Sequence, residues 1–182
     1  YVTHDQTEAL ASGDRIGIVA QGRLQQVGTA DDLIQRPANM FVAKFVGMPS
    51  MNLIDGAIGF DTEADRFMVR IAGQNVLNLP PRWNLALGSY RQPRVVIGIP
   101  PGAFYPETDT HPHEHCGSLE AEIRGVEALV GEVIVTLKPF NGEQPFAALF
   151  QGMDEEAFRL GDFLKIGIDG EHLCLFDPNT TQ

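Results

Sequence analysis

Short apolar alternations dominate the chain from residue 51 onward. Residues 67–71 and 133–137 each carry apolar side chains at every second position, so each run can bury one face of a strand. Gly, Pro and Asn interrupt these runs at short intervals. Further predicted strands lie at Asn52–Ile58, Asn75–Leu79, Arg94–Ile99, Leu119–Leu129, Pro145–Phe150, Phe163–Ile168 and His172–Phe176. Nine short strands with this spacing predict an all-β sandwich or a small barrel.

The first 49 residues mix helical and strand patterns. We expect a strand-like start at Tyr1–Thr3 and a short helix over 5–12 that ends at Gly13. A hairpin follows, with strands at 15–20 and 23–27. Its turn, Gln21-Gly22, suits the positive φ that tight hairpins require. The pattern therefore predicts a small α/β segment before the β-rich part.

Two more short helices are expected in this segment. Thr29 offers an N-cap hydroxyl, acidic residues occupy the next turn, and Pro37 stops the helix. A second helix spans Asn39–Val46, and its apolar residues recur at helical spacing. We interpret these residues as core contacts: Phe41, Val42, Phe45 and Val46.

Charge and composition exclude several classes of protein. The chain has 24 acidic against 13 basic residues and a net charge of -11, which opposes binding to a phosphate backbone. The single tryptophan and scattered basic residues also lack the pattern of a nucleic-acid-binding barrel face. We therefore expect no nucleic-acid partner. Apolar runs are too short to cross a bilayer, and two distant cysteines, Cys116 and Cys174, favour a reducing compartment.

An ordered set of short blocks carries a family resemblance. The blocks are Tyr1-Val2-Thr3-His4-Asp5-Gln6, Asp14-Arg15-Ile16, Gly22-Arg23, Gln26-Val27-Gly28-Thr29, Pro37-Ala38-Asn39, Phe41-Val42-Ala43 and Phe45-Val46-Gly47-Met48-Pro49-Ser50-Met51-Asn52. In this order they resemble the end of an ABC-transporter ATPase domain, most closely the maltose and glycerol-phosphate importer branch. Because the chain also starts at Tyr1 without a methionine or targeting segment, we expect a piece of a longer subunit.

The resemblance gives His4 a role. It corresponds to the family's switch histidine, which reaches the γ-phosphate of ATP, and such positioning is central to phosphoryl transfer. The sequence has no GxxxxGK[ST] phosphate loop and no LSGGQ-like signature. The resemblance therefore implies ATP and Mg²⁺ for the intact parent enzyme. We expect no cofactor and no ATPase activity for this chain alone.

The β-rich part resembles the transport-associated OB-type (TOBE) domain of the same ATPases. The expected organisation is an ABC nucleotide-binding remnant over 1–49 and an OB-like regulatory domain over 50–182, giving a mainly β protein. Two departures from the family pattern occur. Ile99 and Gly102 stand where relatives often carry Arg and Glu, and Val130-Gly131 shifts a predicted turn by one residue. The closing strand makes Cys174 an expected buried thiol.

One segment concentrates metal-ligand side chains. His111, His113, His115 and Cys116 are residue types that Zn²⁺ or Ni²⁺ accepts. Structural zinc sites usually take ligands from two separate segments, and no second ligand pair is visible in the sequence. We therefore interpret residues 111–116 as a solvated loop, with metal binding as the alternative. A zinc titration of the chain and of His113→Ala separates the two.

The sequence supports two functional hypotheses. The first is a regulatory and dimer-organising part of an importer ATPase, with a second ATPase subunit and the membrane permease subunits as partners. This places the chain in the cytoplasm, peripheral to the inner face of the membrane. The alternative is an OB-type domain that senses a small ligand or anion. We find no nucleophile–base pair or carboxylate pair that would make it an enzyme alone.

Overall fold

The computed structural model describes residues 1–71, 75–107, 114–140 and 144–179. The N-terminal elements are α1 (Gln6–Ser12), β1 (Ile16–Ala20), β2 (Arg23–Gly28), α2 (Ala30–Gln35) and α3 (Met40–Phe45). The remaining helices and turns of helix are η1 (Pro81–Trp83), α4 (Asn84–Gly88), η2 (Pro101–Ala103) and η3 (Glu155–Ala157). None of the helices in these ranges combines the length and apolar character needed to cross a membrane.

Ten strands follow residue 51 in the described part of the chain. They are β3 (Asn52–Asp61), β4 (Arg66–Ile71), β5 (Asn75–Asn78), β6 (Arg94–Ile99), β7 (Phe104–Pro106), β8 (His115–Leu129), β9 (Glu132–Pro139), β10 (Phe146–Gln151), β11 (Phe163–Asp169) and β12 (Cys174–Phe176). They form two antiparallel five-stranded sheets, ordered β12-β6-β3-β4-β5 and β10-β9-β8-β11-β7. The prediction of a mainly β, barrel-like fold is confirmed.

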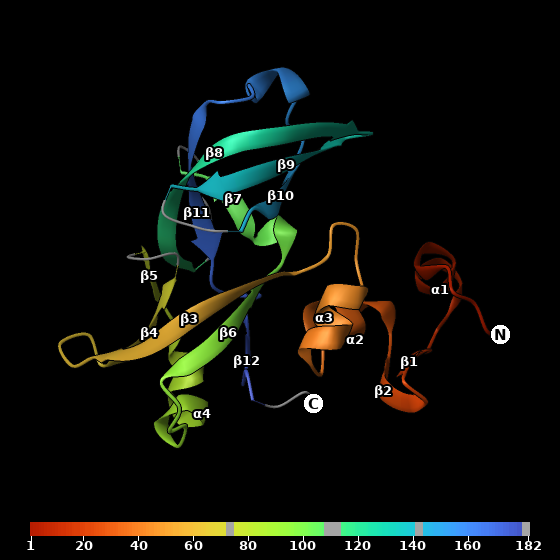
Figure 1. Cartoon of the computed structure of the whole chain (residues 1–182), viewed down its shortest axis with the longest axis horizontal. Helices are drawn as coiled ribbons and strands as arrows, with labels where there is room; N and C mark the ends of the chain where they lie inside the picture. The colour runs from red at the N-terminus through yellow and green to blue at the C-terminus, as the bar shows by residue number, and fades with distance from the viewer. Residues whose placement is uncertain (72–74, 108–113, 141–143, 180–182) are drawn as a thin grey trace.

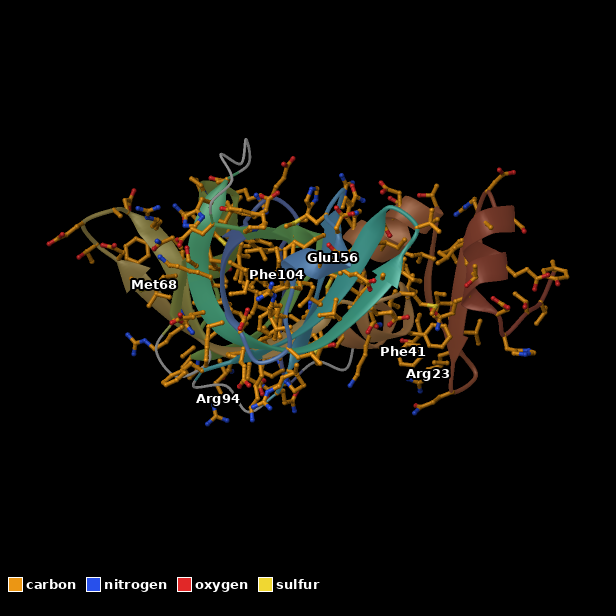
Figure 2. The ribbon with its side chains drawn as sticks, turned by 90° about the horizontal axis from the view of Figure 1, so that it is seen from above. Arg23, Phe41, Met68, Arg94, Phe104 and Glu156 are labelled. Atoms are coloured by element: carbon orange, nitrogen blue, oxygen red, sulfur yellow. The ribbon has the colours of Figure 1, made fainter. Side chains whose placement is uncertain are left out.

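The second sheet curls around the main core (Figure 1). Strand β8 is long and has a register shift between Ile123 and Gly125, which strengthens the twist of the sheet. Where β5 crosses β8, a Cβ on Gly117 would meet the Val76 carbonyl oxygen at 2.8 Å. The glycine lets the two sheets approach. Figure 2 shows Phe104 in the enclosed interior, and its ring stacks on Phe146 at 4.8 Å.

The N-terminal elements have a separate, smaller core. Ile16, Ile18, Leu33, Val42 and Val46 form one buried cluster, and none of them belongs to the cluster inside the sheets. In Figure 1 these elements lie to one side of the two sheets. The hairpin turn has φ of 51° at Gln21 and 72° at Gly22, as its sequence predicts. The register of β8 and β9 places their hairpin turn at Val130-Gly131, also as predicted.

Three local expectations were wrong. Tyr1–Thr3 forms no strand, because within the described residues no neighbouring strand pairs with it. Phe41 and Phe45 are 41% and 40% exposed and stack on each other. Helix α3 instead turns Val42 and Val46 toward Leu33. Cys174 is half-buried, since the three-residue strand β12 pairs on one side with β6 in the described sheet.

Candidate functional site

His4 lies in a bend immediately before α1, with its side chain exposed. The flanking residues are held by Glu8. The Tyr1 hydroxyl donates to its carboxylate at 2.5 Å and the Thr3 hydroxyl at 2.8 Å, while the Glu8 N–H donates to the Asp5 carboxylate at 3.0 Å. The bond to Glu8 raises the pKa of the Tyr1 hydroxyl. These contacts fix the backbone on both sides of the imidazole and leave its ring accessible.

A cavity of about 550 Å³ opens beside this segment. Its lining includes His4, the strand β1 and the end of α3. Several apolar side chains around it are poorly covered: Val19 is 65% exposed and Phe45 is 40% exposed. An imidazole at the edge of an uncovered apolar hollow can donate a hydrogen bond to a group brought by another segment or molecule.

The predicted metal ligands separate in the structure. His111 and His113 lie outside the described residues. His115 and Cys116 are consecutive in β8, and because side chains alternate along a strand they point to opposite faces. His115 is exposed, whereas Cys116 is buried. One metal ion therefore cannot take both side chains without breaking the strand.

Cys116 belongs to the core, so the interpretation of residues 111–116 as a solvated loop is wrong for this residue. It is 1% exposed, and its Sγ donates to the Ile168 carbonyl oxygen at 3.3 Å. Burial raises the pKa of its thiol to about 12, so the thiolate that binds metals is strongly disfavoured. The half-buried Cys174 also has a raised pKa, about 11, again because of burial.

His115 takes part in a polar network that the sequence pattern did not reveal. Its Nδ1 hydrogen-bonds the Tyr105 hydroxyl, and its Nε2 lies 3.4 Å from the Ser118 hydroxyl. Ser118 donates to Glu107 at 2.6 Å, and Lys165 Nζ pairs with Glu107 at 2.5 Å. The Lys165 contact, followed by that of Ser118, lowers the pKa of Glu107. The residues come from three strands or their ends, so only the register brings them together.

A second cavity, of about 770 Å³, lies where the end of α2 meets η1 and β12. Arg36, Arg82 and Trp83 line it, and the Cys174 Sγ bonds the Gln35 carbonyl oxygen across the junction at 3.7 Å. Trp83 Nε1 and Gln35 Oε1 are buried and make no hydrogen bond within the described part of the chain. Arg36 and Arg82 are basic residues in the lining of the cavity, and the Arg82 guanidinium also donates to the carbonyl oxygens of Gly170 and Glu171. Sequence reasoning missed the cavity because its walls lie far apart in the chain.

Comparisons with known proteins cover nearly the whole chain. It is 35% identical over 99% of its length to the xylose/arabinose import ATP-binding protein of Haloferax volcanii, covering 44% of that protein. It is 36% identical to the trehalose/maltose import ATP-binding protein of Thermococcus litoralis, covering 46%. It is 33% identical to the sn-glycerol-3-phosphate import ATP-binding protein of Cupriavidus necator, covering 47%. The chain thus spans about half the length of the curated relatives it matches.

The fold also has a relative among solved structures. The cytoplasmic molybdate-binding protein ModG superposes with a TM-score of 0.55 and 15% identity, covering 70% of this chain and 96% of that one. Because the identity is only 15%, the likeness establishes a shared OB-type fold alone. No model of a protein family matches the sequence. The matches along 99% of its length show that the chain belongs to the ATP-binding subunits of ABC importers and corresponds to their C-terminal part.

Proposed function

We propose that this chain is the regulatory and dimer-organising part of the ATP-hydrolysing subunit of an importer for sugars or glycerol phosphate. The observation that carries the proposal is the match along 99% of the chain to ATP-binding proteins named for xylose/arabinose, trehalose/maltose and glycerol-3-phosphate import. In this role the chain works with a second copy of the subunit and with permease subunits, at the cytoplasmic face of the membrane.

The proposed organisation has two units. Residues 1–49 form the end of the nucleotide-binding domain, and residues 50–182 form the OB-type regulatory domain. Two observations support this division. First, the buried cluster around Leu33 and Val42 shares no residue with the cluster inside the sheets. In addition, Val19 and Leu24 are 65% and 62% exposed on the first unit. Such uncovered apolar side chains suit a surface that the rest of the ATPase domain would bury.

His4 is the residue of this chain that we assign to the ATPase reaction. Its exposed ring lies at the edge of the 550 Å³ cavity and can hydrogen-bond a transferring phosphoryl group or the attacking water. One imidazole does not hold a nucleotide. The phosphate loop and the Mg²⁺ ligands would come from the remainder of the subunit, and Mg²⁺ would neutralise charge on the phosphates there.

The test compares the full-length subunit with the 182-residue chain. We expect the full-length protein to hydrolyse ATP and the chain alone to show no turnover. In the full-length protein His4→Ala should lower kcat about 100-fold or more, the usual effect of removing a transition-state hydrogen bond. His115→Ala is the matched control, because it removes an imidazole that does not line this cavity. Turnover by the chain alone, or an unchanged kcat in His4→Ala, would contradict the proposal.

Dimer organisation is tested by sedimentation of residues 50–182 and of the full chain over a range of concentrations. A dimer-forming unit should gain mass and thermal stability as concentration rises, because association is linked to folding by mass action. A constant monomer mass at all concentrations would contradict the dimer-organising role.

A second function, sensing of a small polar ligand, is favoured by the cavity of about 770 Å³. Its position between the two proposed units would let a ligand couple them. A ligand at 100 times its Kd should stabilise the chain by about 2.7 kcal/mol, irrespective of protein concentration. A thermal-shift screen of sugar phosphates and oxyanions, repeated with Arg82→Ala, tests this role. A response that survives Arg82→Ala would place the ligand elsewhere.

A further inference from the structure

The turn between β11 and β12 is held firmly in place. The Glu171 N–H donates to the Asp169 carboxylate at 2.9 Å, and the Gly170 N–H donates to the Glu114 carbonyl oxygen at 2.8 Å. The Arg82 guanidinium donates to the carbonyl oxygens of Gly170 and Glu171, the latter at 2.7 Å. The backbone of residues 169–171 is therefore fixed by contacts from two other segments.

Three metal-ligand side chains converge on this turn. One ligand atom each from Asp169, Glu171 and His172 lie within 4.8 Å of one another. In a tetrahedral site with bonds of about 2.1 Å the ligand atoms are about 3.4 Å apart. Glu171 and His172 are exposed side chains whose rotation can close that gap.

Burial and charge distinguish this group from an ordinary acidic surface. Asp169 is 4% exposed, and its carboxylate is fixed in position at the floor of the group, where one oxygen accepts the Glu171 N–H. Glu171 and His172 are exposed, so the group is open to solvent on their side. The Arg82 guanidinium donates to the backbone carbonyl oxygens of the turn and lies 3.7 Å from the Glu114 carboxylate. Two carboxylates with one imidazole form a donor set that borderline divalent cations accept.

We propose that Asp169, Glu171 and His172 form a binding site for a divalent transition-metal cation, with Zn²⁺ as the probe. Three protein ligands leave coordination positions for water or for a small ligand. Glu171 and His172 also line the 770 Å³ cavity, so a bound ion would stand at its wall and hold the β11–β12 turn. The proposed site does not depend on the ATPase role. Its ligands lie outside the segment 111–116, where the sequence had suggested metal ligands.

Calorimetric titration of Zn²⁺ into the chain tests the site. We expect Zn²⁺ to bind at one saturable site. His172→Ala and Glu171→Gln should each lower the Zn²⁺ affinity more than about 100-fold, which exceeds the usual effect of changing a residue that only hydrogen-bonds a metal ligand. Both residues are exposed, so circular dichroism should show intact folds. Glu155→Gln is the matched carboxylate control, because that exposed residue lies in η3, away from the group. Absence of saturable binding to the wild-type chain would overturn the proposal.

Two further variants separate this site from the histidine-rich segment. His113→Ala and His115→Ala should retain saturable binding. Loss of binding in either one while His172→Ala still binds Zn²⁺ would place the ion elsewhere and overturn the assignment.

Cobalt provides an independent readout of the ligands. Co²⁺ bound to two carboxylates and an imidazole gives visible d–d bands without a sulfur-to-cobalt charge-transfer band. His172→Ala should abolish these d–d bands. A charge-transfer band from Cys116 or Cys174 would refute the proposed ligand set.

Discussion

The Asn52 carboxamide pairs with the backbone of Ala147 as another strand would. Its Nδ2 donates to the Ala147 carbonyl oxygen at 2.9 Å, and its Oδ1 accepts the Ala147 N–H at 2.8 Å. The same Nδ2 also donates to the Ile99 carbonyl oxygen at 3.0 Å. One side chain at the start of β3 therefore links the edge of β10 to the opposite sheet. Asn52, the last residue of the family-like block 45–52, therefore has a structural role in this chain.

Removing this link should destabilise the β-rich part. Asn52→Ala leaves the partly buried backbone groups of Ala147 without partners, and each such group costs about 1–3 kcal/mol. We expect a loss of about 2–4 kcal/mol in urea denaturation. Asn52→Asp keeps the acceptor but sets a carboxylate oxygen against the Ala147 and Ile99 carbonyl oxygens, so it should not restore stability. Ser89→Ala, which removes one exposed bond to Ala86, should change stability by less than about 0.5 kcal/mol. Equal stability of Asn52→Ala and Ser89→Ala would refute the bridging role.

Gly167 is required by the ring of Tyr105. A Cβ at this position in β11 would lie 2.3 Å from the ring carbon Cζ, and the ring is buried and tied to His115. Gly167→Ala should therefore cost about 1–3 kcal/mol through overpacking. Gly102→Ala is the control, since no atom lies within 4 Å of its added Cβ and its φ is not positive. Thermal unfolding of the two variants measures the difference. Matching melting temperatures would show that the Tyr105 ring moves freely.

The thiol of Cys116 should make stability fall at alkaline pH. Its folded pKa of about 12 exceeds the ordinary value of 9.0, so the unfolded chain releases this proton first. The stabilisation that this thiol gives the folded state is fully present below pH 9 and is lost between pH 9 and 12. The free energy of unfolding should fall by up to about 4 kcal/mol over this range, at about 1.4 kcal/mol per pKa unit. Cys116→Ala lowers stability at neutral pH by loss of packing, but it should flatten this alkaline decline.

The measurement is urea denaturation at several pH values between 8 and 11. Cys174→Ala serves as a comparison, because its pKa is raised less, to about 11. A wild-type decline that persists unchanged in Cys116→Ala would assign the effect to other groups.

Asn39 joins α3 to the hairpin. It is 5% exposed, its Oδ1 accepts the Val42 N–H at 2.9 Å, and its Nδ2 donates to Gln25 at 3.1 Å. Asn39→Ala removes the cap and should destabilise residues 1–49 by about 1–2 kcal/mol. Asn39→Asp retains the cap and should lose less. Hydrogen exchange of α3 amides in the two variants distinguishes them, and equal protection in both would rule out the cap as the main contribution.

Local chemistry in the sequence determined many elements of this protein. The apolar run Arg94–Ile99 predicts β6 to the residue, and Thr29 caps α2 as expected, accepting the Asp32 N–H at 3.1 Å. Gln21-Gly22 and Val130-Gly131 mark their turns because positive φ restricts the residues that fit. The ordered blocks in residues 1–52 also identified the family, since many short matches in one order are hard to obtain by chance.

Tertiary structure decided which residues meet and which stay exposed. Periodicity predicts that α3 has an apolar face, but only packing against Leu33 determines that Val42 is buried while Phe41 is exposed. Pairing of β8 with β11 places His115 opposite Asp169, and the β11–β12 turn then gathers Asp169 and His172. Such contacts depend on strand register over long sequence separations. Local propensity cannot predict these contacts, because it depends only on residues that are neighbours along the chain.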